Sequence, residues 1–477
     1  MNSSKDILTG SGVKFGTSGA RGLVEQFSNQ VCGAFALAFV DVMKRRFDFD
    51  RIAIAIDRRP SSPGMAEACA SVLKSIGLRV DYYGVLPTPA LALKAIHDDI
   101  PSIMITGSHI PFDRNGIKFY RPDGEIDKHD ELAILASEVF VPSVKMMKLV
   151  ESSDAQDFYL QRYTNLFSSD LLSGKKIGVY EHSAAGREIN VMILKALGAS
   201  VVSLGRTDIF VPIDTEAVSE EDQQQAKSWS EEHQLDAIIS TDGDGDRPLL
   251  SDEKGAWLRG DILGLLCAKA LGVQALAVPV SCNTAIDRSA AFMEVLRTRI
   301  GSPYVIEGMQ ALAGRYDGVA GFEANGGFLL QTSLDFNGSR LEPLPTRDAL
   351  LPVLVAFHLA FDQGQAVSEV VDSLPSRYTS SDRIKEFPTE KSRALLDRGA
   401  KDADSFLQSL ALQGSVKQLD LTDGLRLTID VGSSECDIVH LRPSGNAPEL
   451  RCYAESATPE DAQHLVTSVL SRVVVLD

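Results

Sequence analysis

The feature that most constrains the fold is an internal repeat of a strand, a helix and a second strand. The first copy opens on the apolar segment 51–57 and ends in 73–84. The second opens on 176–180 and ends in 194–205. In both copies a glycine stands where the helix should stop, with a valine three residues later and another glycine seven residues later. Such repeats predict mixed, largely parallel sheets with right-handed crossovers.

A looser third copy indicates how the chain divides. It runs from Ala275 to Val280, through a helix to Ile300 and Gly301, and on to Gly308. At 477 residues the chain is long enough for several domains. We therefore expect an α/β protein with three related mixed-sheet domains, at residues 1–150, 151–253 and 254–370.

The remaining residues, 371–477, show a different pattern. Short alternating strands are expected at 425–430, 437–441 and 449–455, followed by a helix that begins at Pro459 with acidic residues in its first turn. The pattern predicts a smaller α+β domain at the C-terminal end.

Charge and cysteine usage limit the partners. The formal charge of −18 and the pI of about 5.0 argue against nucleic acid or a membrane surface as a partner. The six cysteines include no C-x-x-C pair, which is typical of reduced thiols in a cytoplasmic protein. The N-terminus lacks a signal-peptide core, and the apolar run Val31–Val40 is too short to span a bilayer.

A loop around Ser108 is the first candidate site. The strand expected at 103–106 leads into Gly107, Ser108 and His109, and Asn115-Gly116 indicate a turn into a second strand at 117–120. This order places a hydroxyl on an exposed loop, with His109 and Lys118 nearby. The bare Gly-Ser-His triplet is more typical of an ordinary polar loop, and its spacing does not match the Gly-x-Ser-x-Gly elbow of hydrolases.

A second loop predicts a metal site. Asp242, Asp244 and Asp246 alternate with glycines after an apolar strand, so that the backbone can curl and point each carboxylate inward. Hard oxygen ligands of this kind suit Mg²⁺. An EF-hand loop is the rival interpretation, because Glu253 falls at the twelfth position, but Arg247 stands at the sixth position, where that loop needs glycine. A solvated acidic turn would leave the regular spacing unexplained.

Three further loops carry polar groups. The Gly-rich segment 15–22, which includes Arg21, could cradle a phosphate through its amides. The segment 321–327 offers Glu323 and Asn325 to sugar hydroxyls, although it is equally typical of a turn. The segment 442–448 and the next strand form a candidate nest for a dianion, made by Arg442, Ser444, Gly445, Asn446 and Arg451.

Taken in this order, the motifs resemble the α-D-phosphohexomutase superfamily, specifically the bacterial phosphomannomutase/phosphoglucomutase enzymes, over essentially the whole chain. Thr106 to His109 with Pro111 match the family's phosphoserine loop, 242–247 its metal loop and 442–445 its phosphate loop. Pro87-Thr88-Pro89 and Gly260-Asp261 also resemble family segments. The resemblance implies four domains around a central cleft, each contributing one loop.

Some positions depart from the commonest family pattern. Ile110 replaces an asparagine, Asn325 and Gly327 stand where serine and histidine are usual, and Asn446 stands where threonine is usual. The Glu-Ala-Asn-Gly-Gly form of the sugar loop resembles a phosphomannomutase subgroup, while Glu323 is retained.

The resemblance implies interconversion of hexose 6-phosphate and hexose 1-phosphate, with mannose, glucose or both as the sugar. Ser108 would carry a phosphate, and a hexose 1,6-bisphosphate would be the intermediate and activator. Mg²⁺ would be held by Ser108, Asp242, Asp244 and Asp246. Arg21 and Arg247 would neutralise charge, and either Lys118 or His109 would be the general base. Glu323 and Asn325 would hold the sugar, and the nest described above would hold the phosphate that does not react.

Other functions remain open at this point. The chain could be a phosphoglucosamine mutase, a metal-dependent sugar phosphatase or a non-catalytic phosphosugar-binding protein. The expected partner is a small phosphosugar, and the expected state is a monomer or a homodimer.

Overall fold

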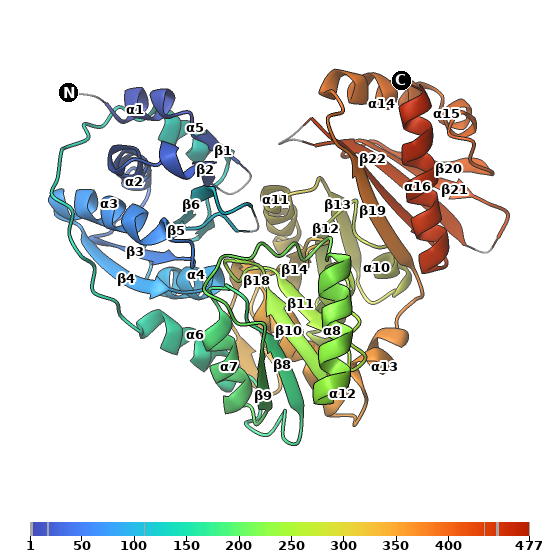
Figure 1. Cartoon of the computed structure of the whole chain (residues 1–477), viewed down its shortest axis with the longest axis horizontal. Helices are drawn as coiled ribbons and strands as arrows, with labels where there is room; N and C mark the ends of the chain where they lie inside the picture. Colours follow the sequence, from blue (N-terminus) through green and yellow to red (C-terminus); the bar gives the residue numbers. More distant parts are fainter. Residues whose placement is uncertain (1–2, 17–18, 109, 434, 445–447, 477) are drawn as a thin grey trace.

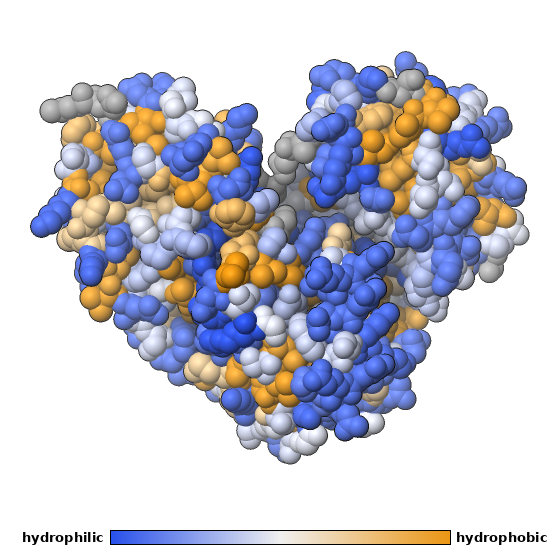
Figure 2. All heavy atoms as spheres, viewed as in Figure 1, coloured by the Kyte–Doolittle hydropathy of each residue, from blue (hydrophilic) through white to orange (hydrophobic). Residues whose placement is uncertain are grey.

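The computed structural model describes the whole chain except residues 1–2, 17–18, 109, 434, 445–447 and 477. The described chain folds into α/β units arranged around a V-shaped gap (Figure 1). The N-terminal unit and the C-terminal unit face each other across this gap, and the middle of the chain forms its base. The space-filling view shows the gap as a hollow in the molecular surface (Figure 2).

The N-terminal unit is built on a mixed sheet with the order β1-β2-β6-β5-β3-β4, and β7 pairs with β6. The inner strands β3 and β5 are parallel, and β5 and β6 are antiparallel. The strands are β1 (Lys14–Phe15), β2 (Gly19–Leu23), β3 (Arg51–Ile56), β4 (Arg79–Val85), β5 (Ser102–Ile105), β6 (Arg114–Arg121) and β7 (Gly124–Glu125). The helices are α1 (Ser4–Ser11), α2 (Asn29–Met43), α3 (Ser62–Ser75), α4 (Thr88–His97) and α5 (Lys128–Ala136), with a 3₁₀ turn at Val24–Gln26.

The second unit contains a sheet with the order β11-β10-β8-β9. Its central strand β10 is parallel to β8 and antiparallel to β11, so the loop between β10 and β11 makes a tight reversal. The elements are α6 (Asp154–Thr164), β8 (Lys176–Tyr180), α7 (Arg187–Ala196), β9 (Ser200–Leu204), α8 (Glu220–His233), β10 (Ala237–Thr241) and β11 (Pro248–Ser251).

The third unit has a mixed sheet with the order β13-β12-β14-β15-β18, and a separate β16-β17 hairpin. Its strands are β12 (Ala275–Pro279), β13 (Glu294–Thr298), β14 (Val319–Phe322), β15 (Phe328–Leu330), β16 (Leu334–Phe336), β17 (Ser339–Leu341) and β18 (Leu344–Asp348). Its helices are α9 (Gly260–Ala270), α10 (Ala285–Arg288), α11 (Ser302–Ala313), α12 (Leu350–Phe361) and α13 (Val367–Asp372).

The C-terminal unit is an antiparallel sheet with the order β19-β23-β22-β21-β20, covered by helices on one face. Its strands are β19 (Tyr378–Ile384), β20 (Ser415–Asp420), β21 (Leu425–Asp430), β22 (Cys436–Pro443) and β23 (Leu450–Ser456). Its helices are α14 (Thr389–Lys401), α15 (Ala403–Ser409) and α16 (Pro459–Leu476). This unit is the expected α+β layer, whereas the four expected boundaries themselves stay predictions.

The structure contains the first two copies of the repeat and corrects the third. Gly77 and Gly198 lie in the left-handed region, with φ of 86° and 95°, just after α3 and α7. In the third copy the helix after β12 is only the four-residue α10, and Ile300-Gly301 precede α11 instead of ending a helix. A return strand follows α10 after a short connection, so the glycine positions fall out of step with the first two copies.

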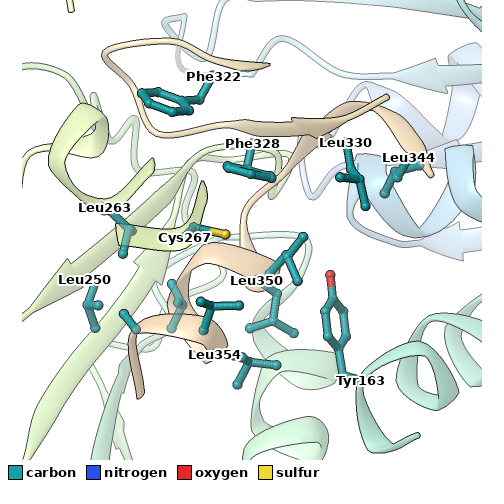
Figure 3. Close-up of a cluster of buried hydrophobic side chains, with 14 of the residues drawn as sticks. Tyr163, Leu250, Leu263, Cys267, Phe322, Phe328, Leu330, Leu344, Leu350 and Leu354 are labelled. Atoms are coloured by element: carbon teal, nitrogen blue, oxygen red, sulfur yellow. The ribbon is translucent and has the colours of Figure 1, made fainter. Parts of the chain in front are cut away.

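The buried core is shared between units. One cluster of buried side chains draws members from Ala53 to Leu374, a second lies within residues 8–141, and a third lies within residues 387–473. Figure 3 shows the centre of the first cluster, where side chains from several elements meet: Tyr163 of α6, Leu263 and Cys267 of α9, Phe322 and Phe328 of the third sheet, and Leu350 and Leu354 of α12. Their burial fixes the strands whose ends carry the loops described below.

Among the described residues, every helix is too short or too polar to cross a lipid bilayer.

Candidate active site

Ser108 lies at a left-handed backbone position on the loop between β5 and β6. Its φ is 51°, which is uncommon for a residue other than glycine. The residue is 1% exposed, whereas residues 111–113 of the same loop are exposed, so the loop lies at the surface as expected but its hydroxyl is buried. The Oγ atom donates a hydrogen bond to Asp242 Oδ2 at 2.8 Å, and the backbone N–H of Ser108 donates to Thr106 Oγ1 at 2.7 Å. The serine is therefore held against the acidic loop.

The turn expected at Asn115-Gly116 is also corrected. Both residues lie inside β6, which begins at Arg114 and pairs with β2 from Leu23 to Gly19. The Asn115 side chain donates to Ser61 and Ser62, so its amide anchors the strand to the start of α3 instead of forming a turn. The loop that carries Ser108 therefore ends earlier than the sequence indicated.

The acidic loop between β10 and β11 approaches Ser108 closely. A Cβ atom on Gly243 would lie 2.8 Å from the Ser108 carbonyl oxygen, and Gly245 has a φ of 73°. Asp242, Asp244 and Asp246 are fully buried, and each offers a carboxylate oxygen within 4.8 Å of the others. The alternating glycines thus let the backbone curl and bring the three carboxylates together, as the sequence predicts.

Buried cations balance the charge of the three carboxylates. Lys118 Nζ of β6 donates to Asp244 Oδ2 at 2.5 Å and to Asp246 Oδ2 at 2.8 Å. Arg347 of β18 donates to Asp246 Oδ2 at 3.0 and 3.1 Å. The Oδ1 atoms of Asp244 and Asp246 are buried without a hydrogen-bond partner among the described residues. Each of these carboxylates thus uses Oδ2 to accept hydrogen bonds from cations, and its Oδ1 makes no hydrogen bond with the described residues.

The local charges shift the pKa values in opposite directions. Burial, then the charges of Asp244 and Asp246, raise the pKa of Asp242 well above its ordinary value. Burial also works against the charged form of Asp246, but Arg347 and Lys118 outweigh it and lower the pKa. Burial acts to lower the pKa of Lys118, but the neighbouring carboxylates outweigh it and the pKa is raised.

Two further arginines border the cluster, as the sequence predicts. Arg247 Nε lies 3.8 Å from Asp246 Oδ1 and 4.0 Å from Asp242 Oδ2. Arg21 belongs to β2 and not to a loop, which corrects part of the Gly-rich segment 15–22. Burial, then the charge of Arg247, lower the pKa of Arg21. Thr17 and Ser18 of that segment lie outside the described residues.

Glu323 and Asn325 form the turn between β14 and β15, where the sequence places the sugar loop. Asn325 Oδ1 accepts from Gly327 N at 3.0 Å, and Gly326 N donates to Glu323 O at 2.9 Å. Glu323 Oε2 accepts from Arg347 Nη1 at 3.3 Å. Arg347 therefore joins this turn to the acidic loop.

Arg442 and Arg451 lie on neighbouring strands of the C-terminal sheet and are directly paired across β22 and β23. Arg442 Nε is 2.9 Å from Asp423 Oδ2, and Arg451 Nη2 is 3.9 Å from Glu449 Oε2. Ser444 N donates to Glu449 O at 2.8 Å, which closes the base of the loop. Gly445 and Asn446, and also His109 of the serine loop, lie outside the described residues.

Sequence reasoning assigned no role to three polar residues that hold the loops. Arg59 is 1% exposed and donates to the Ser108 carbonyl oxygen at 3.0 Å. Its guanidinium also donates hydrogen bonds to the carbonyl oxygens of Ile110 and Pro111. Arg59 therefore fixes the backbone of the serine loop from the buried side. A charged pair, Asp57 and Arg59, directly after a buried strand was the available signal.

The other two are Thr88 and Arg347. Thr88 begins α4 and donates to Asp244 twice at 2.8 Å, from its hydroxyl to Oδ2 and from its backbone N–H to the carbonyl oxygen. The flanking prolines marked this position without indicating its partner. Nothing in the sequence around Arg347 singled it out, because its partners are 24 and 101 residues away.

Comparison with known families matches two parts of the chain. Residues 12–138 match the model of phosphoglucomutase/phosphomannomutase alpha/beta/alpha domain I, and residues 259–378 match domain III of the same family. A crystal structure of a phosphoglucomutase/phosphomannomutase family protein from Burkholderia thailandensis superposes with a TM-score of 0.74 at 17% identity, covering 99% of this chain and 98% of that chain. The likeness extends over all four units and shows the shared four-domain fold.

Curated relatives match nearly the full length. A phosphomannomutase from Salmonella muenchen is 52% identical, covering 98% of this chain and 97% of the relative. A phosphomannomutase from Sinorhizobium fredii is 44% identical, with 96% and 98% covered. A phosphoglucosamine mutase from Maricaulis maris is more distant, at 28% identity, with 96% and 97% covered. The chain belongs to the phosphoglucomutase/phosphomannomutase family of phosphohexomutases.

Proposed function

We propose that this phosphohexomutase interconverts mannose 6-phosphate and mannose 1-phosphate by way of a phosphate carried on Ser108. The observation that carries the proposal is the contact of Ser108 Oγ with Asp242 Oδ2 at 2.8 Å, inside a cluster of three buried carboxylates. A phosphosugar substrate is consistent with the mutases that the chain resembles. The preference for mannose rests on the two phosphomannomutases that share most identity among the relatives described above.

The residues of the acidic loop fit Mg²⁺. The donor set consists of hard carboxylate oxygens, and the buried Oδ1 atoms of Asp244 and Asp246 have no hydrogen-bond partner in the described chain. Asp242, Asp244, Asp246 and the oxygen of Ser108 would hold the ion. When bound, Mg²⁺ supplies a Lewis acid that draws charge from the transferring phosphoryl group.

The protein's own residues supply positioning and charge. The P–O bond to Ser108 breaks as phosphorus bonds to a hydroxyl oxygen of the sugar phosphate. The hydroxyl proton is relayed through Lys118 or His109 to the departing Ser108 Oγ, which regains its hydroxyl. The product is mannose 1,6-bisphosphate. In the second transfer its other phosphate returns to Ser108 Oγ, and a hydroxyl is regenerated on the sugar. Arg21 and Arg247, which border the cluster, would offset the charge on the phosphoryl oxygens.

The C-terminal unit would hold the phosphate that is not reacting. Arg442 and Arg451 lie side by side on β22 and β23, and Ser444 begins the loop between these strands. Gly445 and Asn446 would complete this nest. Because either end of the sugar must occupy it, the same residues would serve both substrates. Glu323 and Asn325 would fix the sugar between the two phosphates.

Phosphorus NMR tests the proposal directly. Mannose 1-phosphate, glucose 1-phosphate and glucosamine 1-phosphate are each incubated with enzyme, Mg²⁺ and a trace of the matching bisphosphate. We expect conversion to the 6-phosphate, fastest for mannose, with little inorganic phosphate released. The Ser108→Ala variant is the matched control and should convert none. Release of inorganic phosphate in place of isomerisation would indicate a phosphatase, and faster conversion of the glucosamine compound would overturn the assignment of mannose.

A further inference from the structure

A cavity of about 750 Å³ lies away from the residues assigned to catalysis, between the end of α4, the helix α6 and the segment 331–345. Its wall is largely apolar and includes Leu93 and Ile96 from α4, Phe158 from α6, Leu341 at the end of β17 and Pro343 just after it. A cavity of this size is in the range that encloses a small organic ligand. The units that meet here come from three distant parts of the sequence.

Two buried polar atoms in the cavity wall lack partners. Arg162 Nε and Gln331 Oε1 are both buried, and neither has a hydrogen-bond partner among the described residues. Because these two atoms are buried, a molecule in the cavity meets other atoms of the same side chains, the nitrogens Arg162 Nη1 and Gln331 Nε2, which are not buried in this way. Both nitrogens are donors and therefore favour a ligand that supplies acceptors. Arg162 Nη2 donates to the carbonyl oxygen of Glu342 at 2.9 Å, which holds the guanidinium in place.

The charges around the cavity favour an anion. Within the described chain, no carboxylate lies within ion-pair distance of Arg162. The two acidic residues in the wall are already paired: Asp123 with Arg121 at 2.7 Å, and Glu342 with Arg340 at 3.3 Å. Arg162 is thus a cation that has a neutral carbonyl as its partner, beside an apolar wall.

We propose that this cavity binds a small amphipathic anion, with its apolar body against Ile96, Phe158 and Leu341 and its anionic group on Arg162. A carboxylate, sulfonate or phosphate would accept from Arg162 Nη1, and a second acceptor on the ligand would accept from Gln331 Nε2. The site is separate from the phosphosugar site, because none of its lining residues belongs to the four catalytic loops.

The cavity shares structural elements with the acidic loop, so binding there should affect turnover. Helix α4 runs from the cavity, at His97, to Thr88, which donates to Asp244. Strand β18 runs from Pro345, in the cavity wall, to Arg347, which pairs with Asp246.

Helix α6 provides a third connection. It carries Phe158 and Arg162 into the cavity, while Tyr159 on the same helix donates to Asp348 at 2.7 Å, next to Arg347. A ligand that shifts α4, α6 or β18 would therefore shift the partners of the acidic loop, which makes the site an effector site.

The binding test uses 8-anilinonaphthalene-1-sulfonate, an aromatic monoanion whose fluorescence rises in apolar surroundings. Titration of the full-length protein should show one saturable site. Arg162→Met should weaken binding by about ten- to a hundredfold, because a charged hydrogen bond is lost. Ile96→Trp should abolish saturable binding by filling the cavity. Arg45→Met, which removes an exposed arginine two residues after the end of α2, is the matched control and should bind as the parent does.

A second variant of Arg162 separates the loss of the charge from a loss of folding. Arg162→Lys keeps the positive charge and should retain most of the affinity, and thermal melts should show that each variant is folded. Parental affinity in both Arg162→Met and Ile96→Trp would overturn the site. Equal loss in folded Arg162→Lys and Arg162→Met would overturn the role of the charge.

The coupling has its own readout. A saturating concentration of the probe should change kcat or KM for mannose 1-phosphate in the parent protein and leave Ile96→Trp unaffected. An unchanged parent, or an equal change in Ile96→Trp, would overturn the coupling. This measurement rests on the proposed mutase activity, whereas the binding titration does not, so failure of the proposed function and failure of the site are distinguishable.

Discussion

Arg347 offers the sharpest test of how the loops are held together. Its guanidinium donates to Asp246 at 3.0 and 3.1 Å and to Glu323 at 3.3 Å, and the residue is 3% exposed. It is thus a buried bridge between the acidic loop and the sugar turn. Replacing it by methionine keeps much of the side-chain length and removes the charge and all three hydrogen bonds.

The contacts that remain set the expected magnitude. Breaking a buried ion pair by removing one partner costs about 3–5 kcal/mol, because the other charge is left without compensation. Asp246 keeps Lys118 at 2.8 Å, whereas the one hydrogen bond that the Glu323 carboxylate keeps with the described residues is that from the Asn325 amide at 3.5 Å. We therefore expect Arg347→Met to lower the free energy of unfolding by about 3 kcal/mol, near the low end of that range.

Catalysis should suffer as well. Glu323 loses its charged anchor, so kcat/KM for the phosphosugar should fall by roughly ten- to a hundredfold, the value of one charged hydrogen bond. The same change removes a positive charge beside the three carboxylates. The variant should therefore bind Mg²⁺ more tightly than the parent does, and Mg²⁺ should raise its stability by the larger amount.

Urea unfolding, followed by the fluorescence of Trp229 and Trp257, measures the stability with and without Mg²⁺. Arg45→Met is the control, because Arg45 forms an exposed ion pair with Asp41 and such pairs contribute only about 0–1 kcal/mol. If Arg347→Met unfolds at the parental urea concentration and keeps the parental kcat/KM, the guanidinium does not bridge the two loops and the reasoning fails.

Four further outcomes are expected. Ser108→Ala should nearly abolish turnover in a folded protein, and intact-mass spectrometry should find one phosphate on the parent and none on the variant; parental activity would exclude Ser108 as the carrier. Asp244→Asn should lose most activity and its response to Mg²⁺. EDTA should abolish the activity of the parent protein, and added Mg²⁺ should restore it; full activity in EDTA would rule out the metal. Arg442→Ala should weaken binding of both mannose phosphates in calorimetry by about 1.5–3 kcal/mol, or one to two decades, and weakening of one isomer alone would mean separate phosphate sites. Burial lowers the pKa of His440 from 6.5 to about 4. The stability that depends on its neutral form is therefore fully present above pH 6.5 and is lost as the pH falls toward 4. At pH 5 the loss in the free energy of unfolding should be about 2 kcal/mol. His440→Phe should show a shallower loss in urea titrations at pH 7 and 5, and an unchanged slope would contradict this account.

Local motifs allowed the chemistry of the site to be predicted from the sequence, because the residues that share a loop are close in the chain. The spacing of Asp242, Asp244 and Asp246 already required a curled backbone, and the structure places the three carboxylates together. The residue that contacts them from the serine loop, Ser108, was predicted from a second motif of the same kind. The roles assigned to these residues stay predictions.

Contacts between distant segments could not be predicted in this way. Arg347 lies 101 residues from Asp246, and Thr88 lies 156 residues from Asp244. The residues that flank Arg347 and Thr88 in the sequence do not indicate which distant residue each one contacts. The third repeat was misplaced for a related reason: glycines mark where elements can end, but not whether a long helix or a four-residue turn lies between them.

The way the buried core is divided also bears on how the protein forms during synthesis. The first helix and sheet bury their own cluster within residues 8–141, so this part can compact as soon as it leaves the ribosome. The cluster that includes Ala53 and Leu374 is complete only after residues 142–374 have also emerged. At the usual rate of about 5–20 residues per second, this cluster stays incomplete for about 12 s or longer after the first unit has emerged. The C-terminal unit, whose core lies within residues 387–473, closes last and on its own. Chaperone dependence should therefore be greatest for nascent chains that end between residues 141 and 374.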